Sequence, residues 1–73
     1  MIYDSMARVI VEWLDGSRES EVWQMIRVPA VGETIMMIDG SERKYRVLAV
    51  QIAAFRGARE SSAADATIGV TST

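Results

Sequence analysis

The sequence predicts a small all-β protein whose five strands close into a barrel, and two patterns lead to that prediction. Apolar residues alternate with polar ones over several short segments, which is the period of strands and not of helices. Two Asp-Gly-Ser triplets, at 15–17 and 39–41, separate pairs of such segments, and an Asp-Gly pair between apolar runs is typical of a β-hairpin. At 73 residues the chain forms a single domain, 1–73, with a thin core, since so short a chain buries only about 60% of the surface it exposes when unfolded.

The first predicted hairpin joins residues 6–14 to residues 19–28. The segment MARVIVEWL alternates apolar and polar side chains and is rich in β-branched residues, so it is predicted to be a strand. The second segment has apolar groups on both faces, which leaves its buried face open. A helix is the alternative there, because Val22, Met25 and Ile26 also fit a helical stripe.

The only proline of the chain marks the next reversal. Pro29 has no amide hydrogen and should end the second strand, and Gly32 permits the conformation of a tight turn. A third strand at 33–39 follows and is joined by the second Asp-Gly-Ser turn to a fourth strand at 43–55.

The fourth strand requires a break in its alternation. A one-residue β-bulge near Leu48-Ala49 restores the pattern and bends the strand, so that it can pair with two neighbours and help to close a barrel. The bulge gives one shared face to Tyr45, Val47, Val50, Ile52 and Ala54. After a small, polar connection at 56–65, residues 66–71 alternate again and are predicted to be the closing strand.

Residues 28–50, VPAVGETIMMIDGSERKYRVLAV, carry a resemblance to known proteins. The run P-A-V-G-E-T-I-M-M followed by Y-R-V-L-A-V resembles short proteins encoded by bacteria, phages and mobile genetic elements, most of which have no assigned function. The resemblance implies an SH3-like small β-barrel. It implies core or turn roles, and no functional role, for Pro29, Gly32, Tyr45, Val47 and Val50.

Catalytic and metal-binding chemistry is poorly represented in this chain. The absence of cysteine and histidine excludes disulfides and the usual zinc ligands, and no acid-base or nucleophilic arrangement has a recognisable spacing. Glu19 and Glu21 are interpreted as charges that protect an edge strand from unwanted pairing. We therefore expect no catalytic residues, no metal and no cofactor, and a protein that is not an enzyme.

The sequence also indicates a cellular location and a charge asymmetry, but these indications are weaker than those for the fold. The N-terminus lacks the pattern of a signal peptide, and no window approaches 18 apolar residues, so a cytoplasmic protein without a membrane partner is expected. Net charge is −2 overall, but residues 1–42 carry three bases against eight acids, and residues 43–73 carry five bases against two acids. This asymmetry indicates either an oriented contact surface or an ordinary mixed surface.

A surplus of apolar residues predicts the function. The side chains expected to fill the barrel are Ala7, Val9, Val11, Trp13, Ile35, Met37, Tyr45, Val47, Val50, Ile52, Ile68 and Val70. The apolar residues then left outside are Ile10, Leu14, Met36, Ile38, Leu48 and one of Val22 and Trp23. Contiguous apolar surface with tryptophan and methionine is typical of an interface. We expect a non-catalytic protein-interaction module, a homo-oligomer or the partner of another protein, with an interface of Trp23, Met36, Ile38 and Leu14. The alternative is that some of these residues cover the ends of the barrel or lie beneath the loop at 56–65.

Two other function classes stay open. The first is a nucleic-acid-binding barrel that contacts an anion through Arg43, Lys44 and Arg46, assisted by Arg56 and Arg59 of the following loop. Tyr45 is expected to face inward, where it cannot stack on a base. The second is a small-molecule site in the pore of an oligomer.

Overall fold

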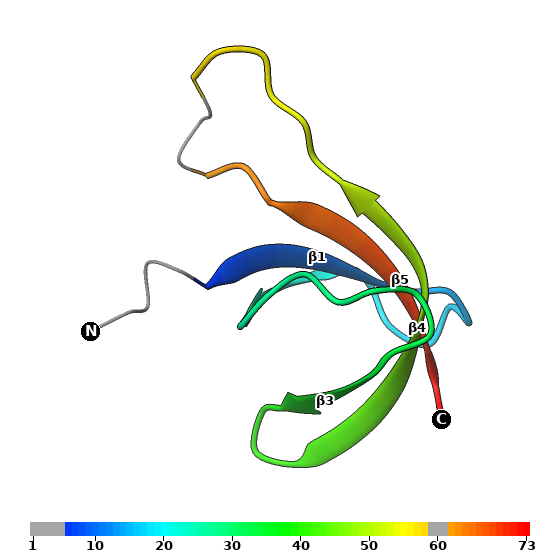
Figure 1. Cartoon of the computed structure of the whole chain (residues 1–73). Helices are drawn as coiled ribbons and strands as arrows, with labels where there is room; N and C mark the ends of the chain where they lie inside the picture. The colour runs from blue at the N-terminus through cyan, green and yellow to red at the C-terminus, as the bar shows by residue number, and fades with distance from the viewer. Residues whose placement is uncertain (1–5, 59–61) are drawn as a thin grey trace.

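The fold is all-β and consists of one strongly curled mixed sheet (Figure 1). It is seen in a computed structural model, which describes residues 6–58 and 62–73. The strands are β1 (Ala7–Trp13), β2 (Glu21–Met25), β3 (Thr34–Ile38), β4 (Glu42–Ile52) and β5 (Ala66–Ser72). The prediction of an all-β fold is confirmed. The helical alternative for the second segment is wrong, because Glu21–Met25 pairs with β1 as a strand.

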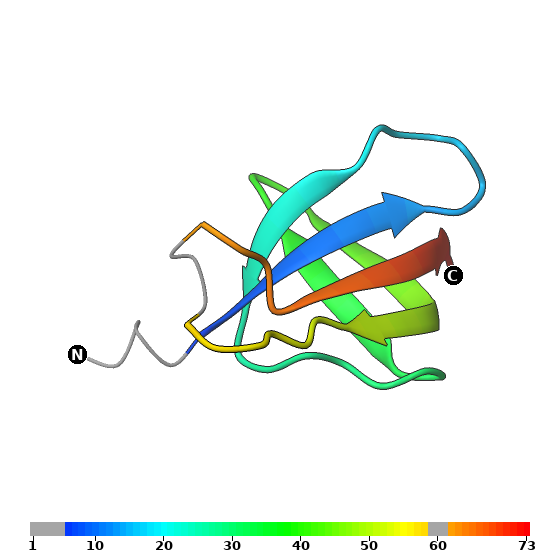
Figure 2. The ribbon, with the colours of Figure 1, turned by 90° about the horizontal axis from the view of Figure 1, so that it is seen from above.

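The sheet forms a half-barrel and not a fully paired barrel. Its strand order is β2-β1-β5-β4-β3, in which β1 and β5 are parallel and the other neighbours are antiparallel. Figure 2 shows β1, β5 and β4 side by side in the curled sheet. The two outermost strands, β2 and β3, are not paired with each other, and no Cα of one lies within 8 Å of a Cα of the other. We call this interruption between β2 and β3 the open seam.

Both Asp-Gly-Ser segments form the predicted hairpin connections. Residues 39–41 join β3 to β4 in a short turn, with Ile38 opposite Glu42 and Gly40 at a φ of 89°. The first connection is longer, at 14–20, and Asp15 shapes it by accepting a hydrogen bond of 2.9 Å from the Ser17 backbone amide. Glycine is needed at position 40 because a residue with a Cβ rarely adopts this positive φ.

The bulge in β4 is confirmed. Val47 lies opposite Val70 of β5, whereas Ala49 lies opposite the preceding residue, Gly69, so Leu48 is the extra residue. Beyond it the pairing resumes with Val50 opposite Ile68. Tyr45, Val47 and Val50 consequently contribute to the same core, as the pattern predicts. Ile52, which the pattern predicts to share this face, lies at the end of β4, is 70% exposed and is not part of the core. Position 54 lies past the end of β4.

The concave face of the sheet holds the core. Its fully buried members are Val9, Val11, Val47, Ile68 and Val70. The other buried members are Trp13, Met37, Tyr45 and Ala66. Fully burying a side chain of this size contributes about 1.5–3 kcal/mol. The rings of Trp13 and Tyr45 meet edge to face with centroids 5.8 Å apart.

Asp65 fixes the start of β5 between its two neighbours. Its Oδ2 accepts a hydrogen bond of 2.7 Å from the Arg8 amide, and its own amide donates to the Arg8 carbonyl at 2.7 Å. Its carbonyl accepts a hydrogen bond of 2.9 Å from the Ala53 amide. One residue therefore ties the ends of three strands together.

Candidate protein-interaction site

The open seam holds an apolar groove of about 620 Å³. One wall is formed by β2 and the residues that follow it, and the other wall by all of β3. The apolar side chains of the groove come from Met6, Trp23, Met25, Ile26, Pro29, Ile35, Met36, Met37 and Ile38. We call this feature the seam groove.

The register of β2 places Trp23 on the inner side of the sheet. Trp23 lies opposite Val9, and it is half-buried against the core. Val22 points outward and is 60% exposed, so the structure decides which face of this strand is buried. The sequence alone could not decide this, because both faces carry apolar residues.

Glu21 holds the Trp23 indole in place. The Trp23 Nε1 donates a hydrogen bond of 3.0 Å to one carboxylate oxygen of Glu21, and Arg18 donates one of 2.9 Å to the other. The Trp23 hydrogen bond, followed by Arg18, lowers the pKa of Glu21. The Arg18 guanidinium also lies over the Trp13 ring, 4.7 Å from its centroid. Glu21 is therefore half-buried and hydrogen-bonded, beyond the edge-protecting role that its pattern indicates, whereas Glu19 is exposed.

Two of the residues that line the seam groove, Arg27 and Glu33, form an ion pair. Arg27 donates two hydrogen bonds, of 2.7 and 2.6 Å, to the Glu33 carboxylate, and the Ala30 amide donates a third at 2.6 Å. These contacts, Arg27 first and Ala30 second, lower the pKa of Glu33 to about 2. Among the described residues that line the seam groove, only these two are charged, and they neutralise each other.

The four predicted interface residues do not all meet. Met36 and Ile38 lie on the outer side of β3, are 50% and 59% exposed, and border the seam groove together with Trp23. Leu14 lies elsewhere, at the end of β1, where its side chain covers Gly69 of β5. Sequence reasoning missed Met25, which lines the groove from the inner side of β2; its position follows once the register with Ala7 is known.

The outer edge of β3 has no hydrogen-bonded neighbour. β3 pairs only with β4, and no backbone hydrogen bond joins it to β2 or to residues 26–29 within the described chain. Along this edge, alternate backbone N–H and C=O groups are available to another strand. The seam groove thus combines an apolar cleft with an unpaired backbone edge.

The basic residues of the alternative function lie beside this region. Arg43, Lys44 and Arg46 are exposed and form no ion pair within residues 6–58 and 62–73. Lys44 and Arg46 lie opposite Met36 and Thr34 on the outer face of the sheet, whereas Arg43 lies opposite the inward residue Met37. Tyr45 is buried and cannot stack on a base. Arg56 is exposed beyond the end of β4, and Arg59 lies outside the described residues.

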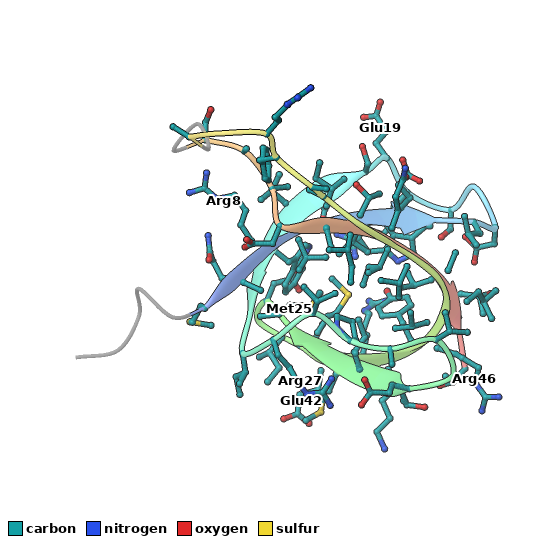
Figure 3. All side chains as sticks on the ribbon, turned by 45° about the horizontal axis from the view of Figure 1, so that its top comes forward. Arg8, Glu19, Met25, Arg27, Glu42 and Arg46 are labelled. Atoms are coloured by element: carbon teal, nitrogen blue, oxygen red, sulfur yellow. The ribbon has the colours of Figure 1, made fainter. Side chains whose placement is uncertain are left out.

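Figure 3 shows how the charged residues are distributed. Glu19 lies at the upper rim of the molecule in that view, whereas Arg27, Glu42 and Arg46 lie at the lower rim near the β3–β4 hairpin. In the strand order β1 and β5 separate β2 from β4, but the curl of the sheet brings Trp13, at the end of β1, into contact with Tyr45 of β4.

In the described part of the chain, no group of three or more acidic, histidine or cysteine side chains is placed to hold a metal ion. The described residues also contain no helix that is long and apolar enough to cross a membrane. Comparison with protein-family models, curated proteins and solved structures gives no match to this chain.

Proposed function

We propose that the protein is a non-catalytic protein-interaction module that self-associates through the seam groove. The observation that carries the proposal is the open seam itself, where an apolar groove lies along an unpaired strand edge. Exposed apolar surface with methionine and tryptophan is common at the centres of protein interfaces. Within this proposal the chain is an SH3-like small barrel, and the curled five-stranded sheet supports the barrel. Its proposed source, a bacterium, phage or mobile genetic element, rests on the resemblance carried by residues 28–50.

Size adds an argument for self-association. A chain of 73 residues without cysteine has few means of adding to a thin core. Covering the seam groove with a second copy would bury apolar side chains that the half-barrel leaves accessible, among them Ile26, which is 87% exposed. Association then supplies stability that the chain cannot obtain from its own core.

Sedimentation over a range of concentrations tests the proposal. We expect the mass to rise above the 8.1 kDa of one chain, and Ile26→Ser to reduce the association. Val31→Ser is the matched control, because Val31 is 62% exposed and does not line the groove. A wild-type chain that remains monomeric at millimolar concentration contradicts the proposal.

A nucleic-acid interface is the second candidate, favoured by the absence of ion pairs at Arg43, Lys44 and Arg46 in the described chain. Its affinity would fall steeply with salt, because contacts between bases and phosphates release counterions. A titration of single-stranded oligonucleotide at low and at physiological salt separates the two functions. Binding that is lost on replacing Lys44 and Arg46 by glutamine would favour this second candidate.

A further inference from the structure

We infer that two copies of the chain join edge to edge through β3, antiparallel about a two-fold axis, with Met36 of one copy opposite Met36 of the other. This inference rests on the proposed function, of which it names the partner and the register. Three observations carry it: the contrast between the two free edges, the self-complementary sequence of β3 and the charges at its ends.

The two free edges differ in protection. Natural sheets discourage edge pairing with charged residues, proline or bulges in the edge strand. β2 begins with Glu21, and Glu19 and Arg18 precede it. β3 reads TIMMI and contains no charge, no proline and no bulge. Of the two free edges, β3 is therefore the one less protected against pairing with a second copy.

The sequence of β3 fits a copy of itself in one register. With Met36 on the two-fold axis, Ile35 lies opposite Met37 of the other copy, and Thr34 lies opposite Ile38. Inward residues then face inward ones, and outward residues face outward ones, as the pleat requires. Moving the axis to Ile35 or Met37 would set Glu33 or Asp39 against an apolar residue and pair fewer positions. With Met36 on the axis, Glu33 lies opposite Asp39 of the other copy just beyond the ends of β3, where the two hydrogen bonds from Arg27 neutralise Glu33.

The charges at the two ends of β3 are complementary. The charged residues near the Thr34 end are Arg27, Glu33 and Arg46, with a net charge of +1. Those near the Ile38 end are Asp39, Glu42 and Arg43, with a net charge of −1. Antiparallel pairing brings the positive end of one copy beside the negative end of the other, twice by symmetry.

Repulsion along the axis is small. Lys44 lies opposite Met36 on β4, so the two Lys44 residues of the pair would be three strand spacings apart. At about 4.8 Å per spacing this is about 14 Å, which is beyond the Debye length of about 8 Å at physiological salt. Screening therefore removes most of this term.

Cysteine cross-linking tests the register directly, since the chain has no cysteine of its own. In the proposed pair the Cα atoms at position 36 are about 4.5–5.5 Å apart, within the span of a disulfide. We expect Met36→Cys to form a disulfide dimer under mild oxidation at least tenfold faster than the control Val22→Cys. Val22 is equally outward-facing, is 60% exposed and lies on the other free edge.

Charge substitution gives an independent measurement. Met36→Lys places like charges opposite each other, and we expect at least a tenfold loss of self-association, with Val22→Lys unchanged as the control. Mixing Met36→Lys with Met36→Glu should restore mixed dimers. Circular dichroism establishes that each variant is folded.

The outcomes separate this inference from the proposed function. A wild-type chain that stays monomeric overturns both. A wild-type dimer that survives Met36→Lys and forms no disulfide through position 36 overturns the β3 pairing alone. Faster cross-linking through position 22 than through position 36 would transfer the interface to β2.

Discussion

The two edges of the sheet are strands of equal length, five residues each, but their side chains are used differently. On β2, Trp23 is packed against the core, and Glu21 is hydrogen-bonded to it and to Arg18. On β3, Met37 enters the core, while Met36 and Ile38 remain half or more exposed and make no polar contact. The comparison teaches that an unpaired edge can be stabilised by its own chain or left apolar and open to a partner.

The largest expected effect is on the free energy of unfolding, because Trp23 of β2 is packed against the core and Met36 of β3 is not. Removing a buried tryptophan typically costs about 3–5 kcal/mol. Because Trp23 is only half-buried, we expect Trp23→Ala to lower the free energy of unfolding by about 2 kcal/mol. Met36→Ala should change it by less than about 0.5 kcal/mol, as is usual for surface positions. Urea unfolding at low protein concentration, where the chain is monomeric, measures both values.

One result of this measurement would contradict the distinction between β2 and β3. Equal losses for Trp23→Ala and Met36→Ala in the monomer would show that both edges serve the core in the same way. The distinction between an anchored β2 and an open β3 would then fail.

The free energy of unfolding is expected to depend on pH because of the ion pair between Arg27, which follows β2, and Glu33, which precedes β3. The pKa of Glu33 is lowered to about 2 by Arg27 and the Ala30 amide, from an ordinary value of 4.5. A lowered folded-state pKa stabilises the fold above pH 4.5, and this contribution is lost as the pH falls towards 2. The free energy of unfolding of the wild type should therefore exceed that of Glu33→Gln at pH 6, and the two should converge between pH 4.5 and 2.

Two controls belong to that experiment. Arg27→Gln should reduce the pH dependence in the same range, since it removes the principal cause of the lowered pKa. Because both side chains are exposed, high salt should reduce the difference at pH 6 as well. A difference between wild type and Glu33→Gln that persists unchanged to pH 2 would assign its origin to something other than the charge of Glu33.

The smallest effect concerns Leu14, a predicted interface residue that the structure places away from the seam groove. Its side chain lies over Gly69, where a Cβ would come within 2.8 Å of the Leu14 Cδ1. Leu14 is 54% exposed, so Leu14→Ala should cost about 1 kcal/mol of stability at most and leave self-association unchanged. Loss of association without loss of stability would instead place Leu14 in the interface.

Local chemistry made much of the fold predictable. The Asp-Gly turns and the break in alternation after Val47 each act over a few residues, and each produced the turn or bulge that it indicates. The strand ends agree less well at β2, which stops at Met25 and not at position 28. There the segment before Pro29 leaves the sheet, and Val28 packs against the core from outside any strand.

The candidate site was less predictable for a physical reason. Met36 and Ile38 could be identified because alternation fixes the outer face of a strand whose inner face is known. Trp23 could be named but not oriented, because apolar groups lie on both faces of its strand. The seam groove depends on which strands become neighbours, and hydrophobic periodicity contains no information about that choice.

The sequence by itself therefore determined the all-β class, the positions of the turns and the bulge of β4, all of which follow from backbone preferences of nearby residues. Only the tertiary structure decided the parallel pairing of β1 with β5, the inward orientation of Trp23 and the seam between β2 and β3. These features join residues far apart in the chain, and their energies come from packing and pairing that exist only after the sheet has curled.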